Sequence, residues 1–147
     1  MKCLKVVTVV FLAIILGLAA LGGCSWGGEA AIPGTEARII RDVTPPQAFT
    51  LIKENEGNPG FIILDVRTPR EFAEGHIAQA VNLDYNSKNF GDSLGRLDKN
   101  LVYLVYCRTG VRSAAASALM AKNGFNKVYN MTGGITDWQA AGLATVK

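Results

Sequence analysis

A cysteine is followed closely by a glycine and two arginines in the C-terminal half of the sequence. The segment reads C-R-T-G-V-R-S from Cys107 to Ser113. Gly110 permits backbone conformations that are closed to other residues, so the N–H groups of a short loop here can turn inward and bind an anion. Arg108 and Arg112 add positive charge, which lowers the pKa of a thiol from its usual value of about 8.5. The pattern therefore predicts a thiolate nucleophile that attacks an anionic substrate.

Other uses of this cysteine are disfavoured. A lone cysteine commonly packs as a small hydrophobe, but two neighbouring arginines do not suit an apolar core. The other cysteines are Cys3 and Cys24, both near the N-terminus, and the sequence has no C-x-x-C pair. One cysteine and one histidine are too few for a typical zinc site. We therefore expect no disulfide, no metal and no other cofactor in the domain.

The spacing of cysteine and arginine separates two anion-directed chemistries. Cysteine phosphatases place five residues between these two side chains, whereas four residues separate Cys107 from Arg112. A phosphate needs a loop wide enough for three equatorial oxygens and the attacking sulfur. A loop that is one residue shorter favours a smaller target, such as a single sulfur atom. A small cysteine phosphatase or arsenate reductase remains the less favoured alternative.

The flanking residues predict how this loop is positioned. Leu101–Tyr106 is the strongest strand candidate, and a helix is predicted at Ser113–Asn123, with Gly124 just past its C-terminal end. In parallel α/β sheets, ligands bind beyond the carboxyl ends of the strands. The helix also adds unpaired N–H groups and the positive end of its dipole. Cys107 is thus predicted to lie where such domains bind ligands.

Strand and helix patterns alternate along the remaining chain. The predicted fold is a three-layer α/β domain with a mainly parallel sheet of about five strands and helices on both faces. Thr44 and Thr68 are each followed by proline and then by Gln47 or Glu71 at the third helical position, which indicates helix starts. The strands are expected at Arg38–Val43, Phe61–Val66, Ala80–Leu83, Leu101–Tyr106 and Lys127–Met131, with further helices around residues 90–97 and at Thr136–Ala141.

The N-terminal segment has the parts of an export signal. A short basic segment, Met1–Lys5, precedes the apolar run Val6–Ala20 and the sequence L-G-G-C ending at Cys24. L-G-G-C resembles the lipobox of bacterial lipoproteins, in which Cys24 becomes the lipidated first residue. The alternative is an uncleaved anchor, because residues 6–23 form an uncharged run near the lower limit for a spanning helix. The expected parts are a signal peptide at 1–23, a lipidated tether at 24–36 and a domain at 37–147.

This organisation predicts where the protein works and what it contacts. Basic residues at the N-terminus keep that end cytoplasmic, so the domain lies outside the inner membrane, in the bacterial cell envelope or periplasm, attached by its lipid. Without Lys2 and Lys5, the 15 Lys and Arg residues become 13, against 12 Asp and Glu. This near-neutral domain has no basic run, so no nucleic-acid partner is expected. We expect a monomer.

Three motifs in order resemble those of single-domain rhodaneses, which are sulfurtransferases. They are D-V-R-T-P-R-E-F-A-E-G-H-I at Asp65–Ile77, Y-C-R-T-G-V-R-S at Tyr106–Ser113 and G-G-I-T-D-W at Gly133–Trp138. The resemblance extends from about Ala37 to the C-terminus. It departs at Gln79, where the family more often has glycine.

The resemblance implies a ping-pong transfer of sulfane sulfur through a persulfide on Cys107. A small anionic donor such as thiosulfate loads the sulfur, and a thiol or cyanide accepts it. Cys107 would be the catalytic residue, and the residues that bind the donor would be Arg108, Thr109, Gly110, Val111 and Arg112. Some family members lack the cysteine, so a non-catalytic module that binds a partner or senses sulfane sulfur is the alternative from another class.

Four further residues are candidates for support of the site. Asp65, Arg67 and Ser113 are expected to support the rim of the site. For Asp65 and Arg67, a purely structural role in an ion pair involving Glu71 is an equal alternative. His76 suggests a Cys–His–Asp triad with Cys107 and Asp65. A structural turn in which its ring bonds to backbone is favoured, because loop dipoles already supply the thiolate.

Overall fold

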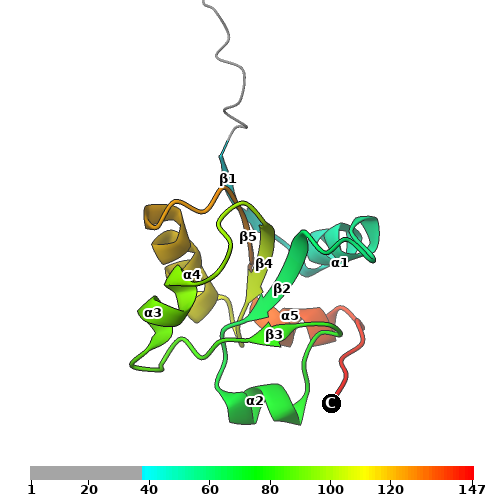
Figure 1. The fold of residues 1–147 in the computed structure, drawn as a ribbon. Coiled ribbons are helices and arrows are strands. Elements are labelled where there is room, and N and C mark those ends of the chain that lie inside the picture. Colours follow the sequence, from blue (N-terminus) through cyan, green and yellow to red (C-terminus); the bar gives the residue numbers. More distant parts are fainter. Residues whose placement is uncertain (1–37) are drawn as a thin grey trace, which may run out of the picture. The chain divides into compact units, whose positions relative to one another are not determined.

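The computed structural model describes residues 38–147. The predicted signal peptide, tether and lipidation site at Cys24 lie outside these residues. Within them, no helix is long and apolar enough to cross a bilayer. The elements in chain order (Figure 1) are β1 Ile39–Val43, α1 Pro45–Glu54, β2 Phe61–Asp65, α2 Pro69–Glu74, β3 Val81–Asn82, α3 Phe90–Gly95, β4 Val102–Tyr106, α4 Val111–Lys122, β5 Lys127–Met131 and α5 Gly134–Ala140.

The five strands form one parallel sheet in the order β1-β5-β4-β2-β3. β4 lies at its centre, which explains why its sequence is an unbroken apolar run. Asp65 of β2 is level with Tyr106 of β4, so both strands end together. The residues that follow these two strands therefore emerge side by side at the carboxyl edge.

Helices cover both faces of the sheet, as expected for a three-layer domain (Figure 1). Side chains of β4 alternate between the two cores: Tyr103 and Val105 face one, while Leu104 and Tyr106 face the other. The first core is closed by α3 and α4, and the second by α1 and α5. The predicted fold class is thereby confirmed, together with all five strands.

The sequence predicted the starts of α1 and α2 correctly. It placed the starts of α4 and α5 two residues too late. Thr44 and Thr68 are N-caps with capping-box partners and proline in the first turn, as predicted; both reciprocal bonds form at Thr68, and at Thr44 the Gln47 side chain bonds back to the cap. In contrast, α4 begins at Val111 rather than Ser113, and α5 begins at Gly134 rather than Thr136. Both of these helices are capped by glycines with left-handed backbone angles, which carry no side-chain signal. The last residues of the cysteine loop therefore already belong to the first turn of α4.

Gln79 occupies a backbone conformation that suits glycine. Its φ of 65° is the only positive value for a non-glycine residue within residues 38–147. We expect Gln79→Gly to raise the free energy of unfolding by roughly 0.5–1 kcal/mol, because relief of the left-handed strain exceeds the added entropy of the unfolded chain. Urea unfolding measures the change. Gln47→Gly, in helical α1, should instead destabilise, and a loss of stability in both variants would contradict the prediction.

Candidate active site

Cys107 lies at the carboxyl end of β4, inside the loop that leads into α4. Its side chain is buried, with 1% of the residue exposed. The N–H of Gly110 donates to Sγ at a distance of 3.2 Å. Gly110 can turn its N–H inward because its φ is 95°, which a side chain would disfavour. The predicted cradle of backbone amides around the sulfur is therefore present.

The surroundings favour the thiolate form of Cys107. Burial raises the pKa of the thiol and is the largest single effect. Hydrogen bonds from the backbone and hydroxyl of Ser113, and from the amides of Thr109 and Gly110, together outweigh burial and lower the pKa below its ordinary value. The leading favourable contributions thus come from amides and a hydroxyl, rather than from the two arginines that the sequence pattern also implicated.

The Ser113 hydroxyl has two possible acceptors and one proton. It donates to the carbonyl of Gly110 at 3.0 Å, and its side chain is fully buried. The same hydroxyl is among the groups that lower the pKa of Cys107, so it can serve the sulfur only when it turns away from that carbonyl. Ser113 therefore lies beside the sulfur, where its hydroxyl can support the thiolate.

Ser113→Ala is expected to raise the pKa of Cys107. The hydroxyl stabilises the thiolate, so its loss moves the ionisation midpoint to higher pH. The ultraviolet absorbance of the thiolate, followed as a difference spectrum against Cys107→Ser, measures that midpoint. Ser117→Ala is the matched control, because Ser117 is also buried in α4 and its hydroxyl has no hydrogen-bond partner in the described part of the chain. Equal midpoints in Ser113→Ala and wild type would contradict the prediction.

Arg112 joins the cysteine loop to α2. Its guanidinium makes two hydrogen bonds to the carboxylate of Glu71, at 2.8 and 2.7 Å. Glu71 also closes the capping box of α2 by accepting from Thr68. The bond from Arg112 is the main reason that the pKa of Glu71 falls to about 2. The pKa of Arg112 is raised, mainly by Glu71 and to a smaller extent by Cys107. The guanidinium therefore lies close to the sulfur as well.

Asp65 and Arg67 form a buried ion pair beneath this rim. The Nη2 of Arg67 lies 2.6 Å from the carboxylate of Asp65 and also donates to the carbonyl of Gly75. Burial lowers the pKa of Arg67, but its bonds to Asp65 raise it above the ordinary value overall. Asn82 donates to the carbonyls of both Asp65 and Arg67, which fixes the turn. Glu71 does take part in a structural ion pair, as the alternative held, but its partner is Arg112, while Asp65 pairs with Arg67.

His76 has a structural position. Its Nδ1 lies 3.1 Å from the carbonyl of Phe72, and its ring stacks on the Phe72 ring with centroids 3.8 Å apart. Its backbone exchanges two hydrogen bonds with Val146. No bond joins His76 to Asp65 or Cys107 within residues 38–147, and the carboxylate of Asp65 is occupied by Arg67. The favoured interpretation of His76 as a structural turn is thus confirmed over the triad.

The start of α5 holds the backbone of the cysteine loop. The N–H of Ile135 donates to the carbonyl of Cys107 at 2.8 Å. Thr136 donates to the carbonyl of Arg108 through its N–H at 3.1 Å and through its hydroxyl at 2.9 Å. These bonds turn two carbonyls away from the sulfur and leave the loop amides to face it. Gly134 packs against the same carbonyls, a role that the sequence indicated only as loop shaping.

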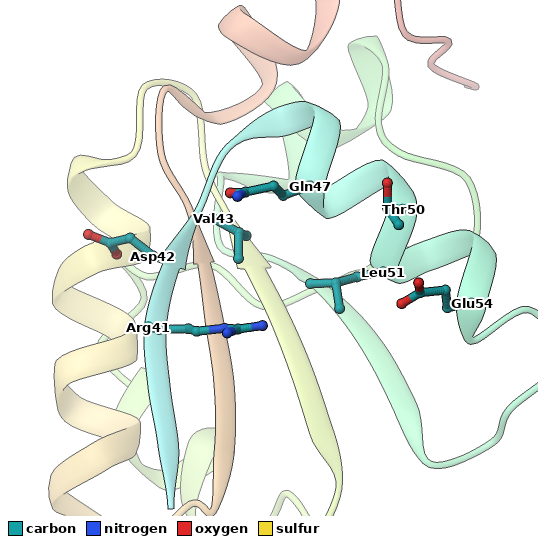
Figure 2. Close-up of a pocket in the computed structure, with 7 residues that line it drawn as sticks. All are labelled: Arg41, Asp42, Val43, Gln47, Thr50, Leu51 and Glu54. Carbon is teal, nitrogen blue, oxygen red and sulfur yellow. The ribbon is translucent and has the colours of Figure 1, made fainter.

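Two cavities differ in their relation to this site. A polar cavity of about 410 Å³ lies beside the cysteine loop, between α2 and α5. Its walls are formed by Arg67, Glu71, Glu74, Gly75, Arg108, Ile135, Thr136 and Gln139. A second cavity, of about 310 Å³, is formed by β1 and α1, and Figure 2 shows the Arg41 side chain pointing into the space between them. Only the first cavity borders the cysteine loop, so it is the candidate substrate site.

Comparisons with known proteins agree with this geometry. The model of the rhodanese-like domain family matches residues 40–141. The chain is 36% identical over 101 residues to thiosulfate sulfurtransferase GlpE of Pseudomonas putida F1, covering 69% of this chain and 86% of the relative. It is 30% identical over 107 residues to GlpE of Actinobacillus pleuropneumoniae L20, covering 73% and 94%. A rhodanese-related protein of Thermoplasma volcanium superposes with a TM-score of 0.60 at 30% identity, covering 72% of this chain and 97% of that one.

Proposed function

Because the chain belongs to the rhodanese-like family, we propose that it is a sulfurtransferase that carries sulfane sulfur as a persulfide on Cys107. The observation that carries the proposal is the buried sulfur that accepts a hydrogen bond from the Gly110 amide and has a lowered pKa. The relatives named thiosulfate sulfurtransferase support thiosulfate as a donor. No metal or cofactor is needed for this chemistry.

In the first half-reaction, the thiolate of Cys107 attacks the outer sulfur of thiosulfate. A new sulfur–sulfur bond forms, the bond within thiosulfate breaks, and its electron pair leaves with sulfite. Sulfite is stable as an anion, so the step needs no general acid. The amides of Thr109 and Gly110 face the sulfur and stabilise the anionic outer sulfur of the persulfide. Arg108 and Arg112 supply positive charge for the donor, and Val111 opens α4 at the rim.

In the second half-reaction, a thiol or cyanide attacks the outer sulfur of the persulfide. The sulfur–sulfur bond breaks and its electron pair returns to Sγ, which regenerates the thiolate. Splitting one transfer into two displacements is nucleophilic catalysis. The cradle stabilises both states of the sulfur, because each carries negative charge in the same ring of N–H groups. The short loop that closes on one sulfur supports this reaction over phosphoryl transfer.

Mass spectrometry of the intact protein tests the proposal. We expect incubation with thiosulfate to add the mass of one sulfur, and cyanide to remove it. Cys107→Ser should gain no mass. Absence of the adduct with both thiosulfate and polysulfide would reject transfer in favour of a non-catalytic binding or sensing module, and turnover of an aryl phosphate would favour the phosphatase alternative.

We further propose that Cys24 carries lipid and holds the domain at a bacterial membrane, outside the cytoplasm. The basic, apolar and small-residue segments that end in L-G-G-C support this location. Incorporation of labelled palmitate by producing cells tests it. Label should be present in wild type and in the control Cys3→Ala, and absent in Cys24→Ala. Unchanged labelling of Cys24→Ala would reject the lipid anchor.

A further inference from the structure

One ion pair, between Glu71 and Arg112, lies between the polar cavity and the sulfur of Cys107. Glu71 lines the cavity and binds Arg112, which in turn lies close to Cys107. On the loop side, the carbonyl of Arg108 is held by Thr136, so the backbone of Arg108 forms a fixed part of the wall. A molecule in this cavity therefore lies against the cysteine loop at Arg108, the residue next to Cys107, and against residues of α2 and α5.

The charges in the cavity wall are mostly neutralised by partners. Arg67 is bound to Asp65, and Glu71 is bound to Arg112. Glu74 lies 3.2 Å from Arg70, in a pair whose side chains are 65% and 90% exposed. Because both side chains are exposed, water readily replaces either partner, and the pair is weak.

Arg108 is the exception among these charged residues. It is exposed, and within residues 38–147 its guanidinium has no hydrogen bond or ion pair. The hydroxyl of Thr136 is already used by the Arg108 carbonyl, while Gln139 adds an uncharged amide to the same wall. The cavity thus presents one unpaired guanidinium, whose planar N–H groups fit a carboxylate with two parallel bonds.

We propose that the cavity binds the sulfur acceptor, and that the acceptor is a small thiol bearing a carboxylate, which Arg108 holds. This rests on the proposed sulfurtransferase function. Cyanide and sulfite are too small to need a cavity of about 410 Å³, which lies within the size range of small-molecule sites. Glu74 lines the same cavity, so an acceptor that also carries an ammonium group, as in an amino-acid thiol, would find a carboxylate there, in exchange for the exposed pair with Arg70.

The transfer balances without a further reactant. The acceptor sulfur attacks the outer sulfur of the anionic persulfide, and the bond from that outer sulfur to Sγ breaks. Sγ keeps the electron pair as a thiolate, and the thiol proton of the acceptor ends on the product persulfide. In this second half-reaction Arg108 contacts only the acceptor carboxylate, so it determines which thiol is chosen without taking part in bond formation, whereas in the first half-reaction its charge serves the donor.

A matched series of thiols tests the proposal in single turnovers. The full-length protein is first loaded with sulfur, and the load is confirmed by intact mass. It is then mixed with mercaptopropionate, mercaptoethanol or cysteamine, which carry a carboxylate, a hydroxyl and an ammonium group. Each rate of persulfide loss is divided by the thiolate concentration, because the three thiols ionise differently.

We expect wild type to prefer mercaptopropionate over mercaptoethanol. The preference should fall about fivefold in Arg108→Gln, since a partly exposed ion pair contributes no more than this, and Arg108→Glu should prefer cysteamine. Arg96→Gln, an equal change of charge at the end of α3, should keep the wild-type preference. Equal preferences in wild type and Arg108→Gln would overturn the proposal. If no sulfur is loaded at all, the proposed function fails instead, so the two failures are distinguishable.

Discussion

Replacing Gly134 by alanine is expected to lower the free energy of unfolding by about 3–5 kcal/mol and to slow persulfide formation about a hundredfold. A Cβ at this position would come within 2.4 Å of the Cys107 carbonyl oxygen and 2.5 Å of the Arg108 carbonyl oxygen. The φ of 60° adds backbone strain for any residue with a side chain. Relief of this clash requires the cysteine loop to separate from α5, which breaks the bonds from Ile135 and Thr136.

Gly142→Ala is the matched control for that experiment. Gly142 has a φ of 74°, but a Cβ there would meet nothing within 4 Å. We expect this variant to lose only about 1 kcal/mol, the cost of the left-handed conformation, and to form the persulfide at the wild-type rate. Urea unfolding and the rate of mass gain with thiosulfate measure the two effects. Equal losses in the two variants would show that contact with the loop carbonyls is unimportant.

Asp65→Ala is expected to destabilise the domain by about 3–5 kcal/mol, because it leaves the guanidinium of Arg67 buried without a counter-charge. Asp65 is fully buried and only 5% of Arg67 is exposed, so the lost partner leaves the guanidinium with the Gly75 carbonyl and one side of the polar cavity in place of a carboxylate. The carboxylate also accepts the backbone N–H of Arg67 at 2.9 Å. Since domains are stable by only about 5–15 kcal/mol, a substantial fraction of the variant should be unfolded at modest temperature.

The double variant Asp65→Ala/Arg67→Met separates the cost of the unpaired charge from the loss of a favourable contact. Methionine fills much of the volume of arginine and carries no charge. If the stranded cation causes the instability, the double variant should regain roughly half of the lost stability or more. A double variant less stable than Asp65→Ala alone would contradict this explanation. Thermal unfolding of the four proteins in the cycle provides the comparison.

Much of the fold follows from signals that are local in the sequence. The capping boxes at Thr44 and Thr68 each involve side chains three residues apart, so the sequence alone predicts them. The central strand is recognisable because burial on both faces requires an unbroken apolar run. The position of the cysteine loop is also predictable, because a strand that ends at Tyr106 places the next residue at the carboxyl edge of the sheet.

The features that sequence reasoning missed depend on contacts between distant segments. Arg112 and Glu71 are 41 positions apart, and Thr136 is 28 positions from Arg108. No periodicity connects such residues, so the sequence does not reveal which carboxylate pairs with which guanidinium. The early starts of α4 and α5 were missed for a different reason: a left-handed glycine caps a helix through its backbone alone. A glycine pair before a short helix, as at Gly133, is the one sequence signal that indicates such a start.

The bonds from α5 to the cysteine loop also set when the thiol becomes reactive during synthesis of the chain. Cys107 leaves the ribosome well before Ile135 and Thr136, which hold the carbonyls of Cys107 and Arg108. Until α5 exists, those carbonyls are free to turn toward the sulfur, where they disfavour the thiolate and raise the pKa of the thiol. We therefore expect a nascent or C-terminally truncated chain to carry a less reactive cysteine, which reaches its full reactivity when the last helix has docked.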